Sequence, residues 1–266
     1  MTDRYTDRRY LTTEQYRTAA NLQARMGLHE RFSTNPYGWH RWVFDQLALP
    51  DGALILELGA GPGRLWAENR DRIPGGWSLT LTDLSPGMAG EQQADLSGLP
   101  QIRSAVSDAQ ALPFADAAFD AVIANHMLYH VPDRERAYDE IRRVLRPGGR
   151  FYAATNGEAH MHELFALARR VDPSAPLERL GFTLENGAVE LGRWFRDVTM
   201  LRYEDSLIVT EAGPLIAYIA SGFRLLPPDK IEDFRRLVET DLAVGPIHIR
   251  KDAGLFVASC RPAGQP

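Results

Sequence analysis

Short apolar runs alternate with longer stretches of helical periodicity in the central part of the chain. Five runs recur at intervals typical of strands, at residues 54–58, 77–82, 102–106, 119–124 and 150–154. Strands separated by helices predict βαβ units and a mostly parallel, doubly wound sheet of the α/β class. Ligands of such sheets bind beyond the carboxyl ends of the strands, so we expect a site there.

The segments on either side of this core predict further elements. Residues 12–32 and 37–48 have the pattern of two helices. After the core we expect a helix, a strand, two more helices and two final strands, at 158–171, 197–204, 211–221, 228–242 and on either side of 251–254. We therefore divide the chain into an N-terminal helical lid (1–50), a ligand-binding Rossmann-like core (51–156), and a helical substrate cap whose C-terminal strands complete the sheet (157–266).

The most informative motif is the glycine-rich segment 56–63, which joins the first predicted strand to a helix. Glycines let the backbone turn tightly and let a ligand approach without obstruction by a Cβ atom. A dinucleotide-binding fingerprint requires glycine at the sixth position counted from Gly59, where Arg64 stands instead. A Rossmann-type oxidoreductase therefore remains only as an alternative that Arg64 disfavours.

Polar residues stand at the ends of the predicted strands. Asp83 ends the second strand, where a carboxylate can accept hydrogen bonds from both hydroxyls of a ribose. Asp108 follows the third strand and is placed to accept from an adenine amino group, with a simple turn-forming role as the alternative. Glu57 lies inside the apolar first strand, where an unpaired carboxylate is costly.

Together these motifs resemble the ordered motifs of class I S-adenosyl-L-methionine (SAM) dependent methyltransferases. The matching segments cover somewhat under half the chain and follow the family's order, at 57–63, 82–85, 107–109, 112–114, 119–120 and 144–149. The resemblance implies a seven-stranded, Rossmann-like sheet that binds SAM and releases S-adenosyl-L-homocysteine (SAH). It also implies a transferase of the small-molecule type, similar to those that tailor bacterial natural products.

The resemblance further implies which residues contact SAM. These are assigned by their place in the motifs: Gly59, Ala60 and Gly61 at the methionine part, Glu57 at the amino group, Asp83 at the ribose, Leu84 and Met88 at the adenine face, Asp108 and Ala109 at its edge, and Asn125 at the end of the fourth strand. An acidic pocket suits a ligand that carries a sulfonium and an ammonium group.

The first long helix carries a polar stripe between apolar residues. Asn21, Arg25 and His29 follow one another at intervals of four residues, with Leu22 and Met26 on one flank. We infer that this helix covers the cofactor cleft, with Asn21 and His29 toward the substrate. Arg25 would pair with the SAM carboxylate. A purely structural role for the stripe is the alternative.

Two histidines after the fourth strand are the candidates for catalysis. A general base near the acceptor assists methyl transfer when the nucleophile must lose a proton. His126 follows the strand end directly, and His130 is the second candidate, with a helix-end role as its alternative. Tyr5, Tyr10 and Tyr16 are placed to form aromatic walls, and we assign Tyr16 to the substrate, although packing explains such tyrosines equally well.

Composition and charge narrow the choice of partners. The formal charge is −5, and only Lys230 and Lys251 among the 30 basic residues are lysines, so a nucleic-acid ligand is not expected. Cys260 is the single cysteine and is expected to be buried in a strand, and no spacing predicts a metal site.

The longest apolar stretch, 214–220, is too short to span a membrane, and residues 1–9 do not have the pattern of a signal peptide. We expect a cytoplasmic monomer or homodimer.

The leading hypothesis is a methyltransferase that acts on O, N or C of a small, aromatic or heteroaromatic metabolite. Three alternatives stay open at this point. They are a SAM-binding module without catalysis, the Rossmann-type oxidoreductase, and an RNA methyltransferase, which would need a basic face that the chain does not show.

Overall fold

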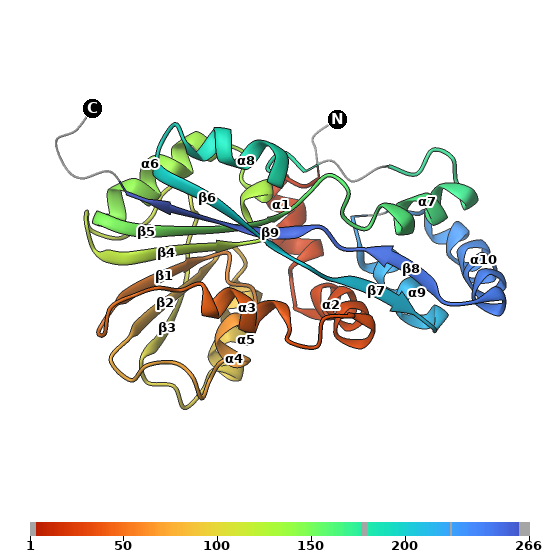
Figure 1. Ribbon diagram of the computed structural model, residues 1–266, viewed down its shortest axis with the longest axis horizontal. Helices are drawn as coiled ribbons and strands as arrows, with labels where there is room; N and C mark the ends of the chain where they lie inside the picture. The colour runs from red at the N-terminus through yellow and green to blue at the C-terminus, as the bar shows by residue number, and fades with distance from the viewer. Residues whose placement is uncertain (1–3, 177–179, 224, 261–266) are drawn as a thin grey trace.

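The computed structural model describes residues 4–176, 180–223 and 225–260, and a seven-stranded sheet forms its centre (Figure 1). The strands lie in the order β3-β2-β1-β4-β5-β9-β6, and β9 runs antiparallel to both of its neighbours. Their bounds are β1 (Leu54–Leu58), β2 (Ser78–Asp83), β3 (Ile102–Val106), β4 (Phe119–Asn125), β5 (Leu145–Asn156), β6 (Arg196–Tyr203) and β9 (Ala253–Ser259). The predicted doubly wound, mostly parallel sheet is confirmed.

The central strands are mostly apolar and buried because helices cover both faces of the sheet. In β1 every residue from Ile55 onward is buried, and β4 buries four residues in a row. The register places Leu58 opposite Thr82 of β2 on one side and Ala124 of β4 on the other. The carboxyl ends of these three strands therefore meet at one edge of the sheet.

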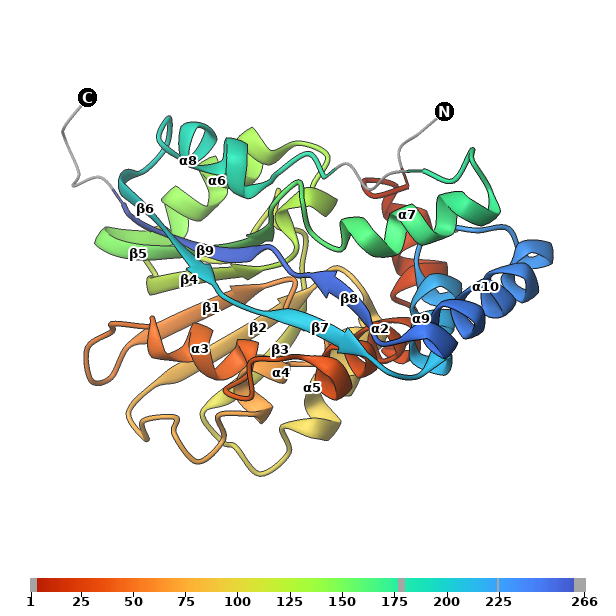
Figure 2. The ribbon, with the colours of Figure 1, turned by 45° about the vertical axis from the view of Figure 1, so that its right-hand side comes forward.

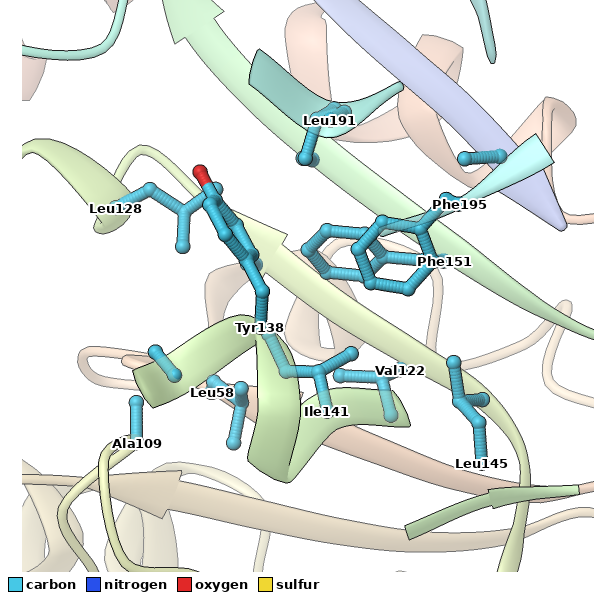
Figure 3. Close-up of a cluster of buried hydrophobic side chains, with 14 of the residues drawn as sticks. Leu58, Ala109, Val122, Leu128, Tyr138, Ile141, Leu145, Phe151, Leu191 and Phe195 are labelled. Carbon is cyan, nitrogen blue, oxygen red and sulfur yellow. The ribbon is translucent and has the colours of Figure 1, made fainter. Parts of the chain in front are cut away.

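Helices lie on both faces of the sheet (Figures 1 and 2), and each face has its own apolar core. The helices of one face are α6 (Arg134–Val144) and α8 (Leu184–Leu191), and those of the other are α3 (Trp39–Asp45), α4 (Arg64–Ala67) and α5 (Pro86–Asp95). Helix α6 begins at Asp133, whose carboxylate accepts a hydrogen bond from the Arg136 amide at 3.1 Å. Figure 3 shows Tyr138 and Ile141 of α6 in the same buried cluster as Phe151 of β5.

A third apolar core lies beyond the carboxyl edge of the sheet and forms the cap. Its elements are α7 (His162–Val171), α9 (Ala212–Ser221), α10 (Ile231–Val244) and a two-stranded sheet of β7 (Ser206–Val209) and β8 (Ile247–Arg250). Helix α2 (Ala20–Phe32) joins this core through Leu28 and Phe32. Figures 1 and 2 both place α2 beside α9, at the end of the large sheet. The first long helix is therefore packed into the cap.

The expectation of one helix over 12–32 is wrong. Helix α1 (Arg8–Tyr10) precedes this segment, which begins inside a π-helical turn over Leu11–Gln15 and continues through a break into α2. The break arises from a tertiary contact, since the Tyr16 carbonyl accepts a hydrogen bond from Ser85 Oγ at 2.7 Å. That contact ties the N-terminal segment to the start of α5.

The two final strands do not pair with each other. Strand β8 pairs with β7 in the cap, and β9 enters the large sheet. Backbone hydrogen bonds redirect the chain between them, because Asp252 donates its amide to His160 Nδ1 at 3.0 Å and accepts from the Gly157 amide at 2.9 Å. Short 3₁₀ turns at Leu128–His130 and Pro228–Lys230 complete the described elements.

The structure also bears on what the sequence predicted for Cys260 and for membrane-spanning helices. Cys260 is buried directly after β9, as expected of a structural thiol. Over the three described ranges, no helix combines the length and the apolar character that crossing a bilayer requires.

Candidate functional site

A cavity of about 530 Å³ lies between the carboxyl ends of the strands and helix α2. Its walls come from the glycine-rich loop, the loops after β2, β3 and β4, the N-terminal segment and the cap. A volume of this size is typical of a site for a small ligand. The cavity therefore lies at the carboxyl ends of the strands, where the sequence predicted a ligand site.

The glycine-rich loop forms the floor of the cavity. Gly59, Gly61 and Gly63 have φ angles of 58°, 56° and 82°, in the left-handed region that favours glycine. A Cβ atom on Gly59 would lie 2.6 Å from the Met127 side chain, so a larger residue does not fit there. On Gly61 it would lie 3.5 Å from Leu22 of α2, which places α2 directly above the loop. Ala60 also lines the cavity.

Asp83 stands at the end of β2 and is fixed by the neighbouring backbone. One carboxylate oxygen accepts from the Gly61 amide at 3.0 Å and the other from the Ser85 amide at 2.8 Å. Burial raises the pKa of Asp83, whereas these backbone hydrogen bonds oppose the shift. Each oxygen keeps acceptor capacity on the cavity side, and this fits the hydroxyl donors of a ribose.

Glu57 and Asn125 form a second polar group at the same end of the cavity. Glu57 accepts from Trp66 Nε1 at 2.5 Å and from Asn125 Nδ2 at 3.2 Å. Burial raises the pKa of Glu57 to about 7 in spite of these hydrogen bonds, and the Asp83 carboxylate adds to the rise. Asn125 Oδ1 is buried and has no hydrogen-bond partner among the described residues. A ligand ammonium group would satisfy this acceptor, so the residues present fit the amino group of SAM.

The expected adenine side contains the apolar residues that the motifs predicted. Leu84, Met88 and Ala109 all line the cavity, and Met88 and Ala109 are buried. Ser107 Oγ is a further buried polar atom without a partner within the described ranges. These positions agree with an adenine pocket, although the individual contacts stay predictions.

Asp108 is already paired within the protein. Its carboxylate forms an ion pair with Arg8 at 3.0 Å and accepts from Gln110 Nε2 at 3.0 Å. Sequence reasoning missed Arg8, because only the fold brings the N-terminal segment to the loop after β3. An adenine amino group would have to share Asp108 with Arg8 and Gln110.

Helix α2 presents a stripe to the cavity that differs by one residue from the predicted one. The lining residues are Leu22, Arg25, Met26, His29 and Glu30. Asn21 is not among them, and its assignment to the substrate is corrected. Its side-chain amide donates to the Gln15 carbonyl at 3.2 Å and so turns toward the N-terminal segment instead.

Arg25 lies between the N-terminal segment and the cap. Its guanidinium donates to the Ser221 carbonyl at 3.1 Å and to the Tyr16 hydroxyl at 3.4 Å. It also lies 5.9 Å from the centre of the Phe223 ring. No carboxylate of the described chain pairs with it, so its predicted role toward the carboxylate of SAM stays open to test.

His130 connects the loop after β4 to the N-terminal segment. Its Nδ1 lies 2.8 Å from the Tyr5 carbonyl, which only accepts, so Nδ1 carries the proton. Nε2 then accepts from the Tyr16 hydroxyl at 3.0 Å. Burial lowers the pKa of His130 to about 4. Since both ring nitrogens are hydrogen-bonded to the protein, the geometry favours a positioning role for His130 and Tyr16.

His126 lines the cavity at the end of β4. Its φ of 51° is uncommon for a residue with a side chain, and it follows β4 directly. The ring lies 5.0 Å from the ring of Trp39 and has no hydrogen-bond partner among the described residues. Burial lowers the pKa of His126 to about 3, and His40 and Lys251 contribute to the shift. The ring is therefore neutral near pH 7.

Sequence reasoning missed two residues at the cap end of the cavity. His160, after β5, lines the cavity, and burial lowers its pKa to about 3. Lys251, between β8 and β9, lines it as well and forms a buried ion pair with Asp205. No signal in the sequence marked His160, and the scarcity of lysine was the only one for Lys251. Within the described part of the chain, no group of His, Cys, Asp or Glu residues has a metal-binding arrangement.

Comparison with known proteins places the motifs in a recognised family of domains. A family described as "Methyltransferase domain" matches residues 56–153. A malonyl-[acyl-carrier protein] O-methyltransferase of Geobacter sulfurreducens is 36% identical over 47% of this chain and 46% of its own. A demethylmenaquinone methyltransferase of Thermus thermophilus is 37% identical over 42% and 51%. The chain spans about half the length of the curated relatives it matches.

Solved structures agree on the fold over nearly the whole chain. The [4+2]-cyclase SpnF has a TM-score of 0.61 at 18% identity, covering 97% of both chains. The Haemonchus contortus phosphoethanolamine N-methyltransferase 2, solved with phosphomonomethylethanolamine and SAH, has a TM-score of 0.60 at 17% identity, over 98% of this chain and 61% of its own. At these identities the likeness establishes the fold alone.

Proposed function

We propose that the protein is a class I SAM-dependent methyltransferase that methylates O, N or C of a small, aromatic or heteroaromatic metabolite, because residues 56–153 match a methyltransferase domain and the matching relatives are methyltransferases. SAM would be its cofactor and SAH its product. The acceptor would occupy the same cavity as SAM, on the side of the cap.

The observation that carries this proposal is the set of buried, incompletely satisfied acceptors at one end of the cavity. Asp83, Glu57 and Asn125 Oδ1 come from the ends of three adjacent strands and surround the glycine-rich loop. Buried polar groups without partners are rare in folded proteins unless a ligand or water satisfies them. A ligand with ribose hydroxyls and an ammonium group matches this set.

Some residues of the cavity would hold the cofactor, and others would position the acceptor. When bound, SAM supplies a methyl group activated by a positively charged sulfur. Asp83 would hold the ribose, and Glu57 with Asn125 would hold the amino group. Helix α2, which lies above the loop, would exclude water, and positioning in the closed cavity would then supply much of the rate.

Aromatic side chains support an aromatic acceptor. Trp39, Tyr129, Tyr218 and Phe223 line the cavity together with Tyr16. Ring faces of this kind pack against a flat ring by stacking or edge contacts. The relatives include an acyl-carrier-protein O-methyltransferase and quinone-pathway C-methyltransferases, so they leave the acceptor atom undecided.

His126 is our candidate for contact with the acceptor nucleophile. A neutral imidazole accepts a hydrogen bond from a hydroxyl or amine and so orients a lone pair toward the methyl group. Because burial lowers its pKa to about 3, storing a full proton on the ring is unfavourable. We therefore propose that His126 acts mainly by hydrogen bonding.

The experiment that tests the proposed function replaces Asp83. Asp83→Ala should weaken SAM binding by about 1.5 kcal/mol or more, since charge-assisted hydrogen bonds are lost. Calorimetry with SAM measures this, and Asp95→Ala, on an exposed residue near the end of α5, is the matched control. A folded Asp83→Ala variant with unchanged SAM affinity, or a wild type that binds NAD in place of SAM, would contradict the proposal.

Labelled SAM separates an enzyme from a binding module without catalysis. Transfer of a radioactive methyl group to members of a panel of small aromatic acceptors supports the enzyme. Tight SAM binding with no transfer to any extract of small metabolites would favour the inactive module.

A further inference from the structure

A buried cation lies at the cap end of the cavity, away from the expected cofactor. The side chain of Lys251 is 10% exposed, and its partner carboxylate on Asp205 is 0% exposed. Asp205 is held in turn by Ser33 Oγ and by the Asn35 amide, at the end of α2. The ammonium also lies 5.9 Å from the centre of the Tyr203 ring. Lys251 is thus fixed in place while it lines the cavity.

Three neutral imidazoles line the same cavity as this cation and feel its charge. The positive charge of Lys251 contributes to the lowered pKa of His29, His126 and His160, although burial is the larger cause in each case. The rings of His29 and His160 lie 6.3 Å apart, and all three histidines line the cavity. This end of the cavity therefore carries one cation and several neutral hydrogen-bonding groups.

The protonation of His160 follows from its contact with the backbone. Its Nδ1 accepts from the Asp252 amide, so the single proton of the neutral ring is on Nε2. His29 Nδ1 is buried without a partner in the described ranges, and no described residue hydrogen-bonds the His126 ring. The hydrogen-bonding capacity of these rings is thus only partly used by the protein.

The carboxylates that line the cavity gather at the cofactor end, opposite the cation and the histidines of the cap end. Glu57, Asp83 and Asp108 belong to the cofactor end, where a cationic ligand is expected. Glu30 and Glu68 line the cavity too, but both form ion pairs with Arg64. The cavity is therefore acidic where SAM would bind and is provided with a cation and N–H donors at the cap.

We propose that the acceptor carries a carboxylate group, which binds to the ammonium of Lys251 and to the Nε2–H of His160. This proposal rests on the proposed function and narrows its acceptor to the aromatic carboxylic acids. An ammonium has three N–H donors, and Asp205 is the one hydrogen-bond acceptor that the described structure gives it. A ligand carboxylate would use the remaining donors, and its aromatic ring would lie toward Trp39 and His126.

A purely structural role for the Lys251 ion pair predicts a different behaviour. The pair also links the end of α2 to the segment between β8 and β9, so its loss would lower stability in either case. Stability alone does not separate the two roles. Preference for a charged over a neutral ligand of the same shape does, because a structural pair would leave that preference unchanged.

The experiment compares two probes on SAH-saturated protein by calorimetry. 4-Hydroxybenzoate carries the carboxylate, and 4-hydroxybenzamide is its neutral counterpart. We expect the wild type to bind the benzoate at least about tenfold more tightly. Lys251→Met should remove that preference while SAH affinity is retained. Lys230→Met, which changes the other lysine of the chain at an exposed site, should keep it.

A second variant guards against misfolding. Lys251→Met leaves the Asp205 carboxylate unpaired, so the double variant Lys251→Met with Asp205→Asn removes both charges and should fold. Equal affinity of the wild type for the two probes, binding of neither, or an unchanged preference in a folded Lys251 variant would overturn the proposal. Absence of SAH binding by the wild type would instead contradict the proposed function itself.

Discussion

At the scale of single residues, the two acidic side chains of the cofactor end differ in how they are satisfied. Asp83 receives backbone hydrogen bonds that favour its charged form. Glu57 is more deeply enclosed, and its donors, Trp66 and Asn125, do not offset burial, so its pKa rises to about 7. A protonated Glu57 cannot pair with an ammonium group. Binding of SAM should therefore release a proton from Glu57.

This proton release predicts how affinity depends on pH. Below about pH 7 the free protein carries a protonated Glu57, and ionising it for the ligand opposes binding. SAH affinity should rise as pH increases from 6 to 8 and level off above the pKa. Calorimetry in buffers of different ionisation enthalpy measures both the affinity and the released proton. Glu57→Gln should bind more weakly with a flatter pH profile, and an identical profile in the two proteins would contradict the assignment.

Residue identities at the cofactor end were predictable because they are fixed by local motifs. The turn at Gly59 and the strand end at Asp83 are each determined by a few neighbouring residues. Arg8, His160 and Lys251 were not predictable, because their positions depend on contacts between segments far apart in the chain. Arg8, for example, meets Asp108 only because the fold brings the N-terminal segment to the loop after β3.

At the scale of elements, helix α2 serves two neighbours at once. Leu28 and Phe32 are buried in the cap core, whereas Arg25 and His29 line the cavity. Removing the N-terminal helices would therefore expose the cap core as well as open the cavity. Point variants of α2 test its role more cleanly than a deletion does.

Arg25→Ala is the informative change in this helix. If Arg25 binds the carboxylate of SAM, the variant should lose about tenfold in SAM affinity. The melting temperature should change little, because the lost protein contacts are hydrogen bonds to one backbone carbonyl and one hydroxyl and the positions over the Tyr16 and Phe223 rings. Gln23→Ala, on the exposed side of α2, is the control. A large drop in melting temperature with unchanged SAM affinity would assign the stripe to structure.

Helices and strands were predictable where the apolar pattern is continuous. The predictions failed where tertiary contacts determine the bounds or the pairing of an element. The strands of the core and α6 follow directly from periodicity and capping. The break before α2 depends on Ser85, and the separation of β8 from β9 depends on His160. Neither contact leaves a signal in the neighbouring sequence.

At the scale of the whole molecule, the cavity lies where the sheet and the cap meet. Two apolar cores hold the helices to the faces of the sheet, and the third holds α2 to the cap. The cofactor end belongs to the sheet, and the proposed acceptor end belongs to the cap. This division explains why the family motifs predict the cofactor and leave the acceptor to residues outside the matched segment.

The most direct test of the SAM site is a crystal structure of the protein with SAH. We expect the ribose hydroxyls to bind the Asp83 carboxylate, the amino group to lie at Glu57 and Asn125, and the adenine to lie beside Leu84. SAH bound elsewhere, or absent from the cavity at a saturating concentration, would contradict the assignment of this cavity as the SAM site.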